Sequence, residues 1–89
     1  MTKAEKESIL AWMDKQIELH DGLEEVKHWD GGITAAPSVY DRRIHILDGL
    51  DKIAKAVGTE IMYRKESLYA FECFYVNYKL YTFFTTPED

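Results

Sequence analysis

Three side chains that could bind a metal ion recur at helical spacing in the first third of the chain. His20, Glu24 and His28 stand at positions i, i+4 and i+8, so a helix that continued this far would place them on one face. Glu25 and His28 also form a Glu-x-x-His pattern, which carboxylate-bridged metal bundles use in pairs. Here the pattern occurs without a second copy. A solvated acidic helix face is therefore the favoured interpretation, and no metal or other cofactor is expected.

The single cysteine, Cys73, is the only thiol that could act as a nucleophile. It falls between Phe71 and Tyr75 on one face of an expected apolar strand, where a cysteine behaves as a small hydrophobic residue. The sequence contains neither a Gly-x-Ser-x-Gly elbow nor a glycine-rich phosphate loop. A lone cysteine also excludes a disulfide framework and a four-cysteine zinc site. We therefore expect a protein without catalytic activity.

Two adjacent arginines are the strongest anion-binding feature. Arg42 and Arg43 fall in the first turns of an expected helix, whose N-terminus offers free backbone N–H groups and the positive end of its dipole. Pairing of these arginines with the acidic first helix is the competing and favoured interpretation. Guanidinium groups bind phosphate through paired hydrogen bonds, and aromatic rings stack on flat ligands. The residues assigned to such a site are Trp29, Tyr40, Arg42, Arg43, Tyr63 and Tyr69.

Composition limits the classes of protein that this chain can belong to. Its 89 residues form a single domain over positions 1–89, with one modest core. The charge count is 11 basic against 16 acidic side chains, a net charge of −5, which argues against general nucleic-acid binding. The charged start at residues 1–7 is unlike a signal peptide, and no stretch is long and apolar enough to span a membrane. A soluble cytoplasmic protein is expected.

Two antiparallel helices are expected, over about 3–28 and 38–57. Thr2 followed by Glu5 has the spacing of a capping box, and Ser38 followed by Asp41 repeats it. Gly22 could end the first helix, but an apolar stripe beyond it favours continuation. The first helix has apolar positions at Ile9, Leu10, Met13 and Ile17, and the second at Tyr40, Ile44, Leu47, Leu50, Ala54 and Val57. Gly58 is suited to end the second helix.

The last third of the chain favours strands, because it is dense in tyrosine, phenylalanine, valine and threonine. We expect a small antiparallel meander over about 60–64, 68–76 and 79–85. Alternate residues would place Cys73 and Tyr75 on one face and Phe74 and Val76 on the other. A helix over 68–84 is the rival interpretation, since both faces are apolar and the turn near Asn77 lacks a glycine. Two helices packed on this meander define an α+β fold.

The aromatic content leads to an expected function. Two Trp, six Tyr and four Phe in so short a chain exceed the needs of one small core, and these types are enriched at interfaces. A sheet with two apolar faces also requires a cover, which a second copy would supply. We expect a non-catalytic accessory regulator or inhibitor, of the kind that phages and mobile elements make, acting through protein contacts and homo-oligomerisation. The alternative is a binder of an anionic, flat molecule such as a nucleotide.

Overall fold

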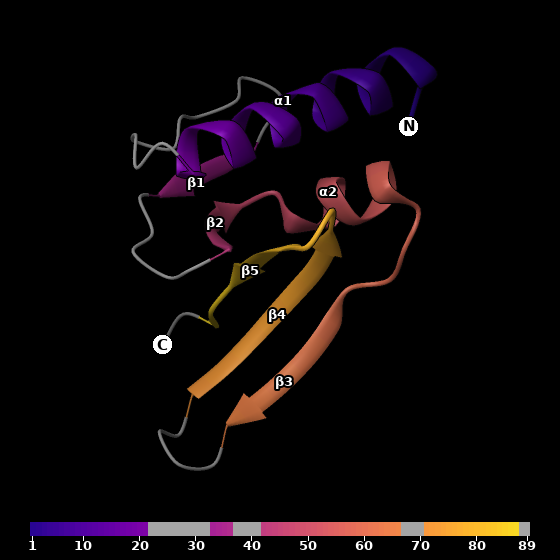
Figure 1. Cartoon of the computed structure of the whole chain (residues 1–89). Helices are drawn as coiled ribbons and strands as arrows, with labels where there is room; N and C mark the ends of the chain where they lie inside the picture. The colour runs from indigo at the N-terminus through magenta and orange to yellow at the C-terminus, as the bar shows by residue number, and fades with distance from the viewer. Residues whose placement is uncertain (22–32, 37–41, 67–70, 88–89) are drawn as a thin grey trace.

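The computed structural model describes residues 1–21, 33–36, 42–66 and 71–87. Within these ranges the chain forms helix α1 (Lys3–Asp21), strands β1 (Thr34–Ala36) and β2 (Arg43–Asp48), helix α2 (Leu50–Val57), and strands β3 (Met62–Glu66), β4 (Phe71–Tyr78) and β5 (Tyr81–Thr85). The strands form one mixed sheet in the order β1-β2-β5-β4-β3, and the helices pack on it (Figure 1). The expected α+β fold is confirmed.

Helix α1 begins as its sequence predicts. The backbone N–H of Glu5 donates to the Thr2 hydroxyl at 3.1 Å, and that hydroxyl donates to the Glu5 carboxylate at 3.1 Å. This cap satisfies one of the backbone groups that the first turn leaves without a helical partner. Ile9 and Met13 are fully buried on the inner face of α1. The expected continuation of the helix through Gly22 to residue 28 lies outside the described residues.

The expected helix over 38–57 is wrong in its first half. Residues 43–48 form β2, which pairs in parallel with β5 and antiparallel with β1. The burial pattern is that of a strand, because Ile44 and Ile46 are buried while Arg43 is exposed. Gly49, with φ of 96°, then turns the chain into α2. Residues 38–41 lie outside the described ranges.

Helix α2 occupies the second half of the expected helix. It ends as predicted at Gly58, whose φ is 83° and whose N–H donates to the carbonyl of Ala54 at 2.9 Å. Its inner face buries Leu50, Ile53 and Ala54. None of the helices in the described part of the chain is long and apolar enough to cross a membrane.

The meander β3-β4-β5 is confirmed as antiparallel, with shifted bounds. Strand β3 continues through Lys65 and Glu66, where a turn was expected. The turn between β4 and β5 lies at Lys79 and Leu80, two residues after the expected position near Asn77. Both turn residues have positive φ, 48° and 68°, which is the backbone that a two-residue hairpin requires even without glycine.

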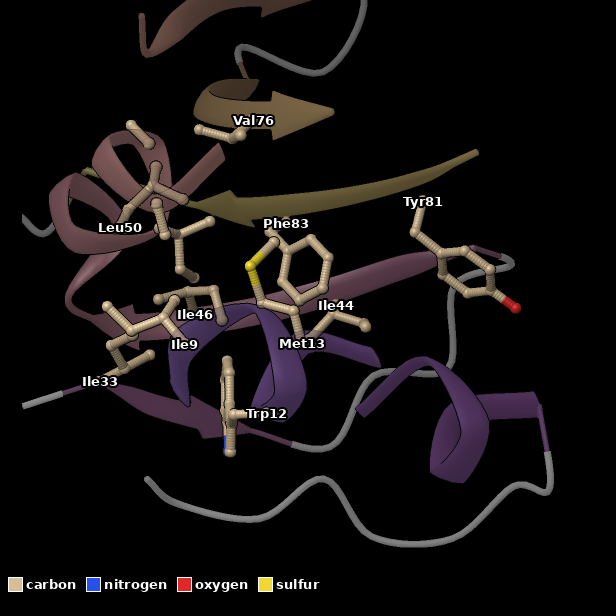
Figure 2. Packing of buried hydrophobic residues seen from close by; sticks show 13 residues of the cluster. Ile9, Trp12, Met13, Ile33, Ile44, Ile46, Leu50, Val76, Tyr81 and Phe83 are labelled. Atoms are coloured by element: carbon tan, nitrogen blue, oxygen red, sulfur yellow. The ribbon is translucent and has the colours of Figure 1, made fainter. Parts of the chain in front are cut away.

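The core lies between α1, α2 and the helix-facing side of the sheet. Figure 2 shows Phe83 of β5 with Met13 of α1 and Ile44 and Ile46 of β2 around it. Side chains alternate between the two sides of a strand, so Val76 and Phe83 face the helices while Tyr75 and Phe84 face away. The other buried members of the core are Ile9, Trp12, Ile33, Leu50, Ile53, Ala54, Ala56 and Tyr81.

Candidate functional site

The helices leave part of the sheet uncovered at the β3-β4 hairpin. Helix α2 has eight residues and is therefore only about 12 Å long. Figure 1 shows the hairpin extending away from both helices. On its helix-facing side, Tyr63 and Phe74 are exposed and their ring centroids lie 5.2 Å apart. Ile61, just before β3, is exposed as well. The chain thus leaves large apolar side chains in solvent at one place.

A hollow of about 380 Å³ lies where this surface meets the start of α2. We call it the apolar groove. Its exposed large apolar residues are Leu47, Ile61 and Phe74, of which Leu47 is 50% exposed. Asp48 and Asp51 are its only ionisable lining residues within the described part of the chain, so its charge is negative. The groove is lined by Leu47, Asp48, Gly49, Leu50, Asp51, Ile61, Phe74 and Thr85.

The opposite side of the sheet carries a smaller hollow of about 200 Å³, which we call the basic pocket. Its lining comes from four strands that the sheet brings side by side. The register pairs Arg43 with Thr82 and Arg64 with Cys73, and alternation puts all four on the side away from the helices. The pocket is lined by Arg43, Arg64, Cys73, Tyr75, Asn77, Thr82 and Phe84.

Among the residues predicted for a ligand site, those that the structure describes are not brought together. Arg43 lines the basic pocket, whereas Tyr63 lies on the other side of the sheet, against Phe74. Arg42 has φ of 55° and its carbonyl accepts a hydrogen bond from the Thr82 N–H at 2.9 Å. Because α2 begins at Leu50, no helix N-terminus lies beside these arginines in the described part of the chain. Trp29, Tyr40 and Tyr69 lie outside the described residues.

Most of the residues that do meet in the basic pocket were not predicted from the sequence. Arg64, Asn77, Thr82 and Phe84 had no expected role. Strand alternation correctly placed Cys73 and Tyr75 on one face, and extending that rule along β3 and β5 identifies the other lining positions. The order of the strands was needed to add Arg43 to them.

The metal hypothesis gains no support from the described residues. His20 lies in the last turn of α1 with its ring edge-on to Tyr81, at 5.9 Å between centroids. Glu24 and His28 lie outside the described ranges. Within those ranges, no three His, Cys, Asp or Glu side chains are placed to hold a metal ion.

A polar contact ties α1 to the β4-β5 turn. The Lys79 ammonium and the Tyr78 hydroxyl both donate to Oδ1 of Asp14 at 2.9 Å. Partial burial pushes the pKa of Asp14 up, but the hydrogen bonds from Lys79 and Tyr78 and the charge of Lys79 together hold it below its ordinary value of 3.8. The contact anchors Lys79 in its left-handed conformation, which is strained for a residue with a side chain.

Asp14→Asn is expected to weaken the dependence of stability on acid pH. Because the folded-state pKa lies below 3.8, the carboxylate contributes stability that is complete above that pH and is lost as the pH falls below it. Urea unfolding of both proteins across the acid range measures this. Glu7→Gln, at an exposed position of the same helix, is the control. An acid dependence unchanged by Asp14→Asn but altered by Glu7→Gln would contradict the assignment.

Comparison with known proteins adds no assignment to this geometry. No protein-family model, no curated protein and no solved structure matches the chain. The apolar groove and the basic pocket are therefore the basis on which a function can be proposed.

Proposed function

We propose that this protein is a non-catalytic binding protein that acts as an accessory regulator or inhibitor by holding an apolar segment of another protein in the apolar groove. The observation that carries the proposal is the exposure of Leu47, Ile61 and Phe74 around one hollow. Apolar surface gathered in this way gains free energy when a partner removes it from water. Phe74 and Tyr63 add flat rings of the kind that anchor interfaces.

The charge around the groove selects the partner's chemistry. Asp48 and Asp51 lie at the groove in a chain with a net charge of −5. A partner segment with an apolar anchor beside lysine or arginine would satisfy both the apolar lining and these carboxylates. A second copy bound through the same groove would instead bring its own Asp48 and Asp51 close, and like charges oppose association. The proposed occupant is therefore a basic, apolar segment of a different protein.

We also propose a cytoplasmic location. Its support is chemical, because the chain has a single cysteine, Cys73, and so cannot form a disulfide within itself. Domains of this size that work in oxidising surroundings are commonly held together by several disulfides.

Selection from a random-peptide library tests the groove while the natural partner is unidentified. Peptides that bind the wild-type protein are expected to carry a large apolar residue next to lysine or arginine, and to lose binding to Phe74→Ser. Phe74 is 37% exposed and is not part of the buried core cluster, so its substitution leaves that cluster intact. The control is Leu80→Ser, the same kind of change at a turn residue that is 85% exposed and outside the groove. Competition binding with a selected peptide measures the loss.

Two results would count against the groove as the working surface. One is a library that yields no binders, and the other is a set of binders that tolerate Phe74→Ser as well as Leu80→Ser. Light scattering on the same samples tests the expected homo-oligomer. If the wild-type mass exceeds the 10.4 kDa of the monomer and falls to that value in Phe74→Ser, a second copy of the chain occupies the groove instead.

A further inference from the structure

Two arginines from distant parts of the sequence border the basic pocket. Arg43 is on β2 and Arg64 on β3, with β5 and β4 between them, and the register sets Arg64 about four residues further along the strands, so their backbones are roughly 20 Å apart. Both arginines line the same hollow, which they border from opposite ends. The described residues that line the pocket include no carboxylate. The pocket therefore has positive charge facing a hollow on the side of the sheet away from the helices.

The pocket also supplies neutral hydrogen-bond donors. The Thr82 hydroxyl donates to Oδ1 of Asn77 at 3.0 Å. This bond occupies the amide's acceptor and leaves its NH₂ group, which carries two hydrogens, to donate. The Tyr75 hydroxyl is a further donor. A lining with guanidinium, amide and phenol donors fits an oxyanion, whose oxygens only accept hydrogen bonds.

Flat rings form the remaining wall. Tyr75 of β4 is paired in register with Phe84 of β5, and both line the pocket. Phe84 is held by His45, whose ring stacks on it with centroids 4.9 Å apart and an angle of 6° between the planes. Rings fixed in this way offer a rigid surface to a flat ligand. The pocket of about 200 Å³ is smaller than the roughly 300–1,000 Å³ of typical ligand sites, which limits the ligand to a head group and about one ring.

We infer that the basic pocket binds a small oxyanion, a phosphate ester or a carboxylate, attached to a single flat ring. Arg43 and Arg64 attract the oxyanion from opposite ends of the pocket, and Tyr75 contacts the ring. This site differs in its residues from the one expected from the sequence: Arg43 and Arg64 replace Arg42 and Arg43 as the anion-binding pair. The basic pocket is distinct from the apolar groove, because the two hollows share no lining residue among those described.

Titration calorimetry at low salt tests the inference with four probes: phenyl phosphate, benzoate, uridine monophosphate and inorganic phosphate. At least one of the ring-bearing probes is expected to bind, more tightly than inorganic phosphate. If phenyl phosphate or uridine monophosphate binds more tightly than benzoate, the ligand is a phosphate ester. If benzoate binds more tightly than both, the ligand is a carboxylate. Added salt is expected to weaken binding, because the attraction is between charges.

Three variants locate the binding. Arg43→Gln and Arg64→Gln are each expected to weaken the best probe about tenfold or more, since each removes a charged hydrogen-bond donor. Tyr75→Leu is expected to weaken ring-bearing probes more than inorganic phosphate, because it removes the contact with the ring as well as one hydroxyl donor. Lys55→Gln, at an exposed position on α2, is the control for loss of one positive charge.

The outcomes that overturn this inference differ from those that would contradict the proposed function of the apolar groove. No binding by any probe overturns it, as does a loss of affinity in Lys55→Gln equal to that in the arginine variants. If inorganic phosphate binds as tightly as phenyl phosphate, the part of the inference that assigns a flat ring to the ligand is wrong. If Phe74→Ser changes the affinity and Arg43→Gln does not, the ligand binds in the apolar groove and not in the basic pocket.

Discussion

Phe83→Ala is expected to lower the free energy of unfolding by about 3–5 kcal/mol, the usual cost of removing a buried phenylalanine side chain. Phe83 is 0% exposed and lies on β5, between β2 and β4. Its ring packs near that of Tyr78, at 6.3 Å between centroids, and belongs to the cluster that joins α1 to the sheet. A folded chain of 89 residues has a total stability of roughly 5–13 kcal/mol, so the variant loses a large fraction of it.

Chemical denaturation with urea measures this loss, and Phe74→Ala is the matched control. Phe74 is on the neighbouring strand and on the same side of the sheet, yet it is partly exposed at the groove. Its truncation removes less buried surface and is expected to cost about 1 kcal/mol. Equal losses in the two variants would mean that Phe83 is not at the centre of the core.

Gly49→Ala is expected to destabilise the protein by about 1–2 kcal/mol, because a residue with a Cβ pays that cost in the left-handed region. Gly49 has φ of 96° where β2 ends and α2 begins. The helix expected over 38–57 predicts the opposite sign. In a helix interior, alanine in place of glycine would stabilise by about 1 kcal/mol. One substitution therefore distinguishes a strand followed by a helix from a continuous helix.

Thermal and urea unfolding of Gly49→Ala and Gly58→Ala give the comparison. Gly58 ends α2 with φ of 83°, and a Cβ there would meet no described atom within 4 Å. Its substitution thus measures the cost of the left-handed conformation alone. A gain of stability in Gly49→Ala, alongside a loss in Gly58→Ala, would show that residues 43–57 form one helix.

The two proposed surfaces arise from one property of the fold. The two helices cover β2, β5 and part of β4 on one side of the sheet. Ile61, just before β3, and Phe74 of β4 then border the apolar groove at the start of α2, while the side of the sheet away from the helices carries the basic pocket. Substitutions at Phe74 and at Arg43 can therefore separate the two binding activities.

Local sequence determined the elements whose signals lie within a few residues of one another. The cap of Thr2 and Glu5 started α1, Gly58 ended α2, and the density of aromatic and β-branched residues after position 59 predicted the meander. Strand alternation also separated Cys73 from Phe74 correctly. These features depend on backbone preference and on side-chain periodicity, which act over short distances along the chain.

The tertiary structure decided the conformation of residues 43–48. The positions Ile44, Leu47 and Leu50 fit a helical repeat, while Ile44 and Ile46, on either side of His45, fit a strand. Pairing with β5 settled the ambiguity: it aligns Ile44 with Phe83, about forty positions later, and buries both under α1. No local pattern reports a partner so far along the chain.

The same long-range pairing assembled the basic pocket, because Arg43 and Arg64 approach one ligand-sized hollow only when β5 and β4 lie between their strands. The residue types that suit an anion were readable in the sequence. Which arginines would line one hollow depended on the strand order, which is set by the burial of side chains distant in sequence against a common core.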